Sequence, residues 1–406
     1  MRVCFVSRRF FPAVSGMSIY ATNLLREMVA AGHDVTLVSQ FYGGGHASVY
    51  GGGPPPPVPG VRVIGLEALG EQDGGDFERD IVTLADTIVA EHAERPFDIL
   101  HAQYAYPTGW ATLLTSRRTG VPNLVSVQGG DGHWVGSCCE THRLAMVRTL
   151  DHAGALLIGG ESFRDEVCER LGTSPGRFTL VPGAVDTAQF HPADGERPPG
   201  PLRILYHGRV DRRKGVLDFL EALHSLDRPE LAWCASISGI GPDLEPARAL
   251  AAERGLTEDR LRFLGYVAYD AAPEVYRAHD LFASPTYSEG FSNTILEAMA
   301  SGLPVLSCRA VGVVDCLRDG ETSLLVEPGD VAAQAGALER LLSDAALRAR
   351  LADAALAECR RTYSWTAVGR EIMAVYHRLA GTSPDADFDP ALPLTPCRFR
   401  DAPHLL

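Results

Sequence analysis

Short apolar segments alternate with amphipathic helical segments along most of this chain. The first repeat runs from a buried strand at residues 2–7, through a helix at about residues 18–31, to a second strand at residues 34–39. Single helices separate the later apolar segments in the same way. Because parallel strands need a crossover connection, usually a helix, this alternation predicts an α/β fold with doubly wound parallel sheets.

The alternation breaks between residues 186 and 201, where the sequence is polar and rich in proline. A chain of 406 residues is also too long for a single hydrophobic core. We therefore predict two Rossmann-like domains, at residues 1–190 and 202–363. Residues 381–406 are proline-rich and lack a helical or strand period, so we expect a flexible tail.

Charge and composition argue against several functions. The chain has 37 basic and 51 acidic residues, giving a formal net charge of -14, which disfavours binding to nucleic acid or anionic lipid. The turn after the first strand lacks the three glycines of a dinucleotide fingerprint, which disfavours a nicotinamide or flavin enzyme. The N-terminal apolar run is too short for a signal peptide, and no stretch reaches about 18 apolar residues. We expect a cytoplasmic protein, and membrane association is disfavoured.

The sequence predicts neither a metal site nor a cofactor. The nine cysteines are scattered and show no paired metal-binding spacing, so we expect reduced thiols. A close repeat of carboxylates at residues 385–389 lies in the expected tail and is not expected to bind a cation. Nothing in the sequence defines the oligomeric state.

The most distinctive segment runs from residue 284 to residue 305. A buried strand ends here, an acidic turn follows at Glu289, and an amphipathic helix then runs to Gly302. Ligands of open α/β sheets bind at the carboxyl ends of strands, and the free N–H groups of a helix N-terminus hold phosphate. Glu289 and Glu297 can each accept hydrogen bonds from paired sugar hydroxyls. The same pattern also fits an ordinary capped helix with Glu297 as a solvated charge.

A basic segment, HGRVDRRKG, follows the first strand of the second domain and contains Arg209 and Lys214. Among 37 basic residues, Lys214 is the only lysine. An arginine fork and a lysine ammonium on either side of one turn suit a diphosphate and can stabilise a leaving group. The alternative is that both are solvated surface cations, and the single lysine argues against it.

Five motifs resemble those of the family 4 glycosyltransferases, and the resemblance covers residues 1 to about 379. The motifs are GRVDRRKG, SGIGP, FLGYV, EGFSNTILEAMASGLPV and LLVEPGD. The resemblance implies the GT-B fold, in which two Rossmann-like domains face across a cleft. It also implies retaining transfer of a sugar from a nucleotide-diphospho-sugar, and a final helix at residues 364–380 that crosses back onto the first domain.

The resemblance further implies roles for individual residues. Arg209 and Lys214 would act in catalysis on the donor diphosphate, and Glu289 would act on the hydroxyls of the transferred sugar. Glu297 would bind the ribose. The remaining implied donor contacts are Gly16, Gly208, Tyr266, Val267, Gly290, Phe291, Ser292, Asn293 and Thr294.

The chain departs from the family at Gln128, which stands in the motif VQGGD where the family usually has a histidine. Glutamine can hydrogen-bond a sugar but cannot accept a proton as imidazole does. The family's mechanism is usually described as a same-face substitution in which the leaving phosphate takes the acceptor's proton, so loss of the imidazole need not abolish transfer. Core packing is the expected fate of at least two of the aromatic residues Tyr104, Tyr106, Trp110 and Trp134. We expect acceptor or sugar contacts from Gln128, Asp131, His133, Tyr104 and Trp134.

These observations predict a retaining enzyme that moves a hexosyl or N-acetylhexosaminyl group from a UDP-sugar to a hydroxyl. The expected acceptor is a soluble small molecule, such as a secondary-metabolite precursor in antibiotic biosynthesis. The nucleotide-sugar is a substrate and not a cofactor. The first alternative is a glycosyltransferase of cell-envelope lipid or polysaccharide synthesis. The others are a nucleotide-sugar epimerase or hydrolase, and a non-catalytic nucleotide-sugar binder.

Overall fold

The computed structural model describes residues 1–13, 15–43, 52–129, 135–195, 200–226, 228 and 230–402. The chain forms two compact units. Unit 1 comprises Met1–Pro182 and Val368–Leu406, and unit 2 comprises Gly183–Ala367. The structure divides the units between residues 182 and 183, whereas the sequence suggests an end of the first domain at residue 190. The difference arises because Phe190 is fully buried in unit 2. Its ring packs against those of Tyr269 and Tyr276, so this polar stretch belongs to the core of unit 2.

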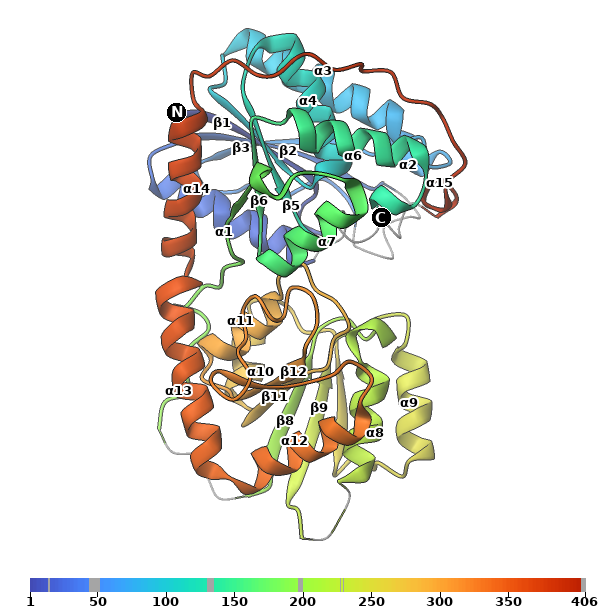
Figure 1. The fold of residues 1–406 in the computed structure, drawn as a ribbon, viewed down its shortest axis with the longest axis vertical. Helices are drawn as coiled ribbons and strands as arrows, with labels where there is room; N and C mark the ends of the chain where they lie inside the picture. Colours follow the sequence, from blue (N-terminus) through green and yellow to red (C-terminus); the bar gives the residue numbers. More distant parts are fainter. Residues whose placement is uncertain are drawn as a thin grey trace. The chain divides into compact units, whose positions relative to one another are not determined.

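Among the described residues, unit 1 is built on a seven-stranded sheet with the order β3-β2-β1-β4-β5-β6-β7 (Figure 1). All neighbouring strands are parallel, as the alternation of strands and helices predicts. The inner strands are buried along their whole length because helices cover both faces. The strands are β1 (Arg2–Arg9), β2 (Asp34–Phe41), β3 (Val61–Glu67), β4 (Ile99–Gln103), β5 (Asn123–Val127), β6 (Ala155–Ile158) and β7 (Phe178–Leu180).

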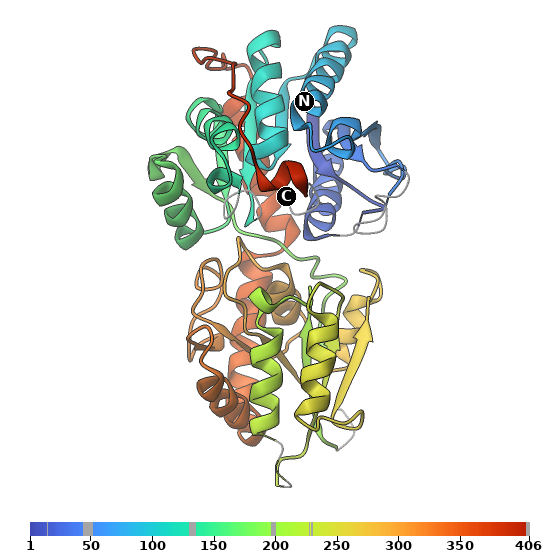
Figure 2. The same cartoon turned by 90° about the vertical axis from the view of Figure 1, so that its right-hand side faces the viewer.

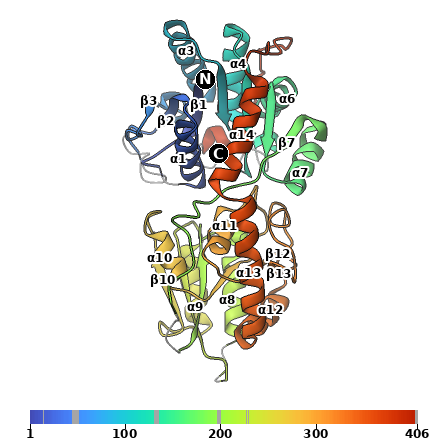
Figure 3. The same ribbon diagram turned by 90° about the vertical axis from the view of Figure 1, so that its left-hand side faces the viewer.

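The described part of unit 1 contains eight α-helices. They are α1 (Gly16–Ala30), α2 (Leu69–Gln72), α3 (Phe77–Glu94), α4 (Trp110–Thr119), α6 (Glu140–His152), α7 (Glu161–Leu171), α14 (Trp365–Leu379) and α15 (Arg398–Asp401). Helix α3 packs against α4, and α4 packs against α6. Helix α14 lies beside α1 (Figure 3), where the Tyr376 hydroxyl is 3.9 Å from the sulfur of Met28. The same hydroxyl lies 2.5 Å from Nδ1 of His101 in β4, so the final helix is anchored in the core of unit 1.

The segment after α14 follows a defined path over unit 1, although its composition suggests a flexible tail. It is drawn in dark red in Figures 1 and 2 and ends at α15. Phe388 is buried, and its ring packs against that of Trp110. Arg400 donates two hydrogen bonds of 2.6 and 2.7 Å to the carboxylate of Glu78. Side-chain anchors therefore fix a segment that has almost no regular secondary structure.

In the described part of unit 2, a six-stranded parallel sheet has the order β10-β9-β8-β11-β12-β13. The strands are β8 (Leu202–His207), β9 (Trp233–Ser238), β10 (Leu261–Gly265), β11 (Leu281–Ser284), β12 (Val305–Cys308) and β13 (Ser323–Val326). The helices, all labelled in Figure 1, are α8 (Val216–Ser225), α9 (Leu244–Glu253), α10 (Ala272–Arg277), α11 (Asn293–Ala300), α12 (Val331–Ser343) and α13 (Ala345–Thr362).

The core of unit 2 has two apolar clusters. Successive side chains of a strand point to opposite faces of a sheet, so Ile204 and Leu205 of β8 join different clusters. One cluster contains residues of α8, α9, α12 and the first half of α13, and the other contains residues of α10, α11 and the second half of α13. No described helix is both long enough and apolar enough to cross a membrane.

The strand order of each unit reverses direction at one point. In unit 2 the chain builds outward from β8 to β10, then returns to the other side of β8 with β11. The loops that follow β8 and β11 therefore leave neighbouring strands at the same edge of the sheet. Unit 1 has the same arrangement at β1 and β4. Such a switch point is where open α/β sheets bind ligands.

Candidate functional site

Two glycines shape the loop that leaves β8. Gly208 has a φ of 140° and Gly239, after β9, has a φ of 138°, a region that side chains rarely adopt. A Cβ atom on Gly239 would lie 1.8 Å from the carbonyl oxygen of Gly208. The two loop backbones are thus in direct contact, and only glycine fits at residue 239.

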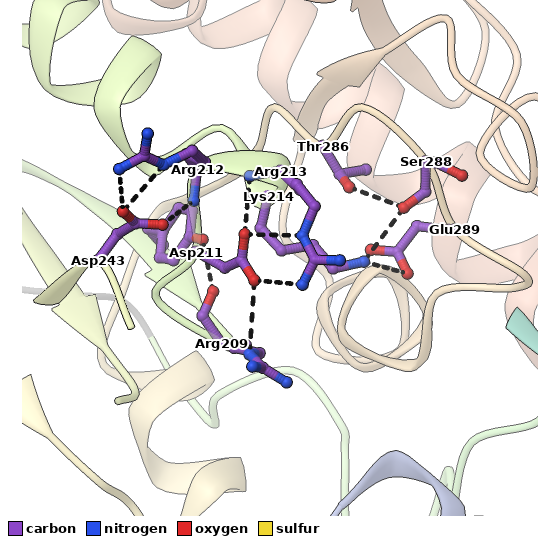
Figure 4. Close-up of polar contacts among 10 residues, drawn as sticks. Arg209, Asp211, Arg212, Arg213, Lys214, Asp243, Thr286, Ser288 and Glu289 are labelled. Atoms are coloured by element: carbon purple, nitrogen blue, oxygen red, sulfur yellow. Dashed lines mark hydrogen bonds and ion pairs between the residues drawn. The ribbon is translucent and has the colours of Figure 1, made fainter. Parts of the chain in front are cut away.

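Asp211 organises the basic residues of this loop, as Figure 4 shows. Its carboxylate accepts a 2.6 Å hydrogen bond from Nη2 of Arg213 and lies 3.5 Å from Nε of Arg209. Burial alone would raise the pKa of Asp211, but the hydrogen bonds and charge of Arg213 outweigh it and lower this pKa. Asp211 therefore stays ionised and holds the Arg209 side chain, a role that the sequence analysis missed.

Lys214 and Glu289 form an ion pair across the two switch-point loops. Nζ of Lys214 lies 2.8 Å from Oε2 of Glu289 and donates to the carbonyl oxygen of Ser288 at 3.1 Å (Figure 4). The Lys214 side chain is 33% exposed and that of Glu289 is 17% exposed, so solvent reaches the pair. Both predicted side chains therefore meet at the carboxyl ends of β8 and β11.

The backbone around this ion pair is tightly packed. A Cβ atom on Gly215 would lie 1.9 Å from the carbonyl oxygen of Pro285, and one on Gly312 would lie 2.2 Å from that of Glu289. The N–H group of Glu289 donates to the carbonyl of Val311 at 2.9 Å. Close backbone contacts with residues 311–312 therefore fix the backbone of Glu289.

Helix α11 begins beside the same loops. Ser292 is buried at the N-cap position, and its hydroxyl lies 3.2 Å from that of Thr294. The ring of Phe291 packs against Tyr363 at 5.7 Å, so this side chain faces the protein interior. Donor contacts from Gly290, Asn293 and the other residues of this turn remain a prediction.

Glu297 is almost fully buried and is not the solvated charge that the alternative reading allowed. The hydroxyl of Tyr276 donates to its Oε2 atom at 2.8 Å. Burial raises the pKa of Glu297 to about 7, because its effect outweighs that of the hydrogen bond from Tyr276, which acts to lower this pKa. Glu297 therefore lies inside unit 2 on α11, whereas Glu289 lies in the partly exposed loop before that helix.

The predicted donor contacts Tyr266 and Val267 follow β10. Tyr266 is 53% exposed, and Val267 is partly buried against the second apolar cluster of unit 2. The N–H group of Gly239 donates to the carbonyl of Gly265 at 2.7 Å, which joins this segment to the loop after β9. Tyr266 is therefore the more accessible of the two side chains.

In unit 1 the predicted residues lie at the ends of β4 and β5 and at the start of α1. Gly16 is the exposed first residue of α1, after the N-cap Ser15. Gln128 follows β5, and its Oε1 accepts a 3.2 Å hydrogen bond from Gln103 at the end of β4. Tyr104 has a φ of 79°, which turns the chain sharply after β4. Asp131, His133 and Trp134 lie outside the described residues. Tyr106 and Trp110 are buried, which confirms the expected core packing of two aromatic residues.

Sequence reasoning missed a buried polar cluster at the end of β1. Arg8 and Arg9 both bind the carboxylate of Glu71, which also accepts a hydrogen bond from the Tyr42 hydroxyl. Burial would raise the pKa of Glu71, but the charges of the two arginines outweigh it and lower this pKa. Adjacent arginines at the end of the first strand are the sequence signal for this cluster.

Comparison with known proteins agrees with this architecture. Residues 15–184 match the family described as glycosyl transferase 4-like domain, and residues 201–344 match glycosyl transferases group 1. A glycogen synthase of Mycobacterium tuberculosis is 27% identical over 424 residues, covering 97% of this chain and 98% of that protein. A D-inositol 3-phosphate glycosyltransferase of Salinispora tropica is 27% identical over 401 residues, covering 89% and 80% of the two chains.

Solved structures show the same fold. The crystal structure of Anabaena HepE in complex with UDP has a TM-score of 0.74 and 16% identity, and the match covers 93% of this chain and 100% of that one. Two parallel-sheet α/β domains of this kind make up the GT-B fold. The chain is a glycosyltransferase of GT-B type, with a glycosyl transferase 4-like domain in its N-terminal part and a glycosyl transferases group 1 domain in its C-terminal part.

Proposed function

We propose that this glycosyltransferase transfers a sugar from a UDP-sugar, with retention of configuration, to a hydroxyl of a soluble small molecule. The observation that carries the proposal is the ion pair between Lys214 and Glu289 at the switch point of unit 2. The UDP complex of HepE, a protein of the same fold, supports the choice of nucleotide. The formal net charge of -14 favours a soluble acceptor over an anionic lipid.

The contacts of the ion pair suggest how a donor is held. Without donor, the Lys214 ammonium is neutralised by Glu289. When donor binds, we expect Lys214 and Arg209 to face the diphosphate and Glu289 to accept hydrogen bonds from the transferred sugar. We expect the N-terminal N–H groups of α11 to face the phosphates and Glu297 to bind the ribose.

The proposed reaction is a substitution on one face of the sugar. The bond from the anomeric carbon to the β-phosphate oxygen breaks, and a bond from the same carbon to the acceptor oxygen forms. The acceptor's proton passes to the leaving phosphate, so Gln128 need not act as a base. Negative charge grows on the leaving diphosphate, where Lys214 and Arg209 stabilise it more strongly than in the ground state.

Substitution of Lys214 tests this proposal. We expect Lys214→Ala to lower turnover by about 100-fold or more, the scale found for other groups that stabilise a developing charge. Lys214→Arg keeps the charge but changes its shape, and we expect a substantial loss as well. The matched control is Arg212→Ala, because this neighbouring guanidinium is 67% exposed and is bound to Asp243. Turnover that is unchanged in Lys214→Ala would refute the assignment.

The donor and acceptor need a direct screen. Thermal shift with a panel of nucleotide-sugars identifies the donor, because a ligand that binds only the folded state raises its melting temperature. The panel should pair UDP-hexoses with UDP-N-acetylhexosamines to separate the two sugar classes. The acceptor panel should include a polyol phosphate, given the named activity of the Salinispora relative. Consumption of donor without any acceptor would instead favour an epimerase or hydrolase.

A further inference from the structure

Four side chains that commonly bind metals converge in unit 1, outside the proposed donor site. Cys138 and Cys139 precede α6, His142 lies in its first turn, and Cys397 directly precedes α15. The three sulfur atoms and one ring nitrogen all lie within 4.8 Å of one another. His142 and Cys397 are 255 residues apart in the sequence, so the fold alone brings them together.

The distances within this cluster suit a tetrahedral ion. Nδ1 of His142 lies 3.1 Å from the sulfur of Cys138 and 3.6 Å from that of Cys397. Tetrahedral zinc, with bonds of about 2.3 Å to sulfur and about 2.0 Å to nitrogen, holds its ligand atoms about 3.5–3.8 Å apart. A contraction of about 1 Å at the widest separation, with a widening of about 0.4 Å between Nδ1 of His142 and the sulfur of Cys138, therefore gives zinc geometry.

The α6 ligands are held by the local backbone. Cys139 occupies the N-cap position of α6, and its sulfur accepts a hydrogen bond from the N–H group of His142 at 3.5 Å. His142 is buried, and its ring centroid is 4.4 Å from that of Tyr106 and 5.6 Å from that of Phe77. This packing keeps the His142 ring in the orientation that turns Nδ1 toward the thiols.

The tail is guided to the cluster from both sides of Cys397. The hydroxyl of Thr141 accepts from the N–H group of Thr395 at 3.0 Å, and the N–H group of Thr141 donates to the Thr395 hydroxyl at 3.3 Å. On the other side, Arg400 is bound to Glu78 through two hydrogen bonds. These contacts fix the tail backbone, so less conformational entropy is lost when the metal binds.

We propose that Cys138, Cys139, His142 and Cys397 bind one zinc ion that fastens the C-terminal tail to α6. Thiolates and imidazole suit zinc, whereas calcium and magnesium prefer oxygen ligands. Each thiol releases its proton to solvent on binding, and His142 binds as neutral imidazole through Nδ1. Four protein ligands fill a tetrahedral shell and leave no position for substrate, so the site is structural. Cys138 and Cys139 are partly exposed, which gives the ion a route of entry.

The test uses the full chain, purified in a non-thiol reductant without chelators. Elemental analysis should find about one zinc per chain, as expected for a closed four-ligand site. Cobalt added to metal-stripped protein should give sulfur-to-cobalt charge transfer and tetrahedral d–d absorption. Cys397→Ser removes a ligand and should lower zinc affinity by more than about 100-fold, the upper loss found when a residue that hydrogen-bonds to a metal ligand is substituted. Cys168→Ser, in α7 and outside the cluster, should retain zinc.

Hydrogen exchange of the tail distinguishes a zinc ion that fastens the tail to α6 from zinc that is bound adventitiously. Removal of zinc should speed exchange at residues 391–402 in the unmodified chain but not in Cys397→Ser. The inference is overturned if the unmodified chain binds no zinc, or if Cys397→Ser binds it equally well. A disulfide that links Cys397 to Cys138 or Cys139 in the purified protein would overturn it too. The zinc content of the unmodified chain tests the proposal even if a variant misfolds.

Discussion

The buried carboxyl group of Glu297 should make the stability of unit 2 depend on pH. Burial raises the pKa of Glu297 from the ordinary value of 4.5 to about 7. The folded state therefore binds more protons than the unfolded state between these two values. The free energy of unfolding must then fall as pH rises through this range. The contribution is fully present below the unfolded pKa and is lost as pH passes about 7.

The magnitude follows from the difference between the two pKa values. Each pKa unit corresponds to about 1.4 kcal/mol, so the whole effect is ~3 kcal/mol. About 2.5 kcal/mol of it should appear between pH 5 and pH 8, because the unfolded carboxyl is already largely ionised at pH 5. Glu297→Gln carries no titrating group at this position and should lack this component of the pH dependence.

The assay compares the full-length chain with Glu297→Gln by urea unfolding at several pH values. Circular dichroism follows the transition, and hydrogen exchange of peptides from β8 and α11 isolates unit 2. The unfolding free energy of the wild type minus that of the variant should fall by about 2.5 kcal/mol from pH 5 to pH 8. Tyr276→Phe removes the hydrogen bond that lowers the pKa of Glu297, so its transition should move to higher pH. A difference that stays constant with pH would refute the reasoning.

Two further substitutions test the loops around the ion pair. Gly239→Ala should destabilise the protein by at least ~2 kcal/mol in urea unfolding, because its Cβ atom would lie 1.8 Å from the carbonyl of Gly208. Gly255→Ala is the control, since no heavy atom lies within 4 Å of its added Cβ, and an equal loss there would contradict the steric account. Asp211→Asn removes the charge that holds Arg209 and should raise the KM for donor about tenfold, as for loss of a hydrogen bond to a charged group. A KM unchanged in Asp211→Asn would show that Asp211 does not position the donor site.

The sequence alone determined the doubly wound α/β organisation of both domains and the strand ends that carry the candidate site. Alternating apolar segments and helices predict parallel sheets, because the spacing of apolar residues in each segment depends on which of its faces is buried. The sequence placed Lys214 and Glu289 at strand ends, and they meet because the loops after the neighbouring strands β8 and β11 leave the same edge of the sheet. The division of the units was placed slightly differently, since a polar composition did not reveal that Phe190 is buried.

Tertiary structure alone decided which partners surround those residues. Nothing in the local sequence shows that Tyr276 would bind Glu297, or that α11 would bury this carboxyl and raise its pKa. The same holds for Cys397, whose neighbours on α6 lie more than 250 residues earlier. Local hydration and backbone preferences act over a few residues, whereas these contacts exist only after long loops have closed. Residue type and order therefore predict the fold and the chemistry of the site, and packing sets its electrostatics and fixes the tail.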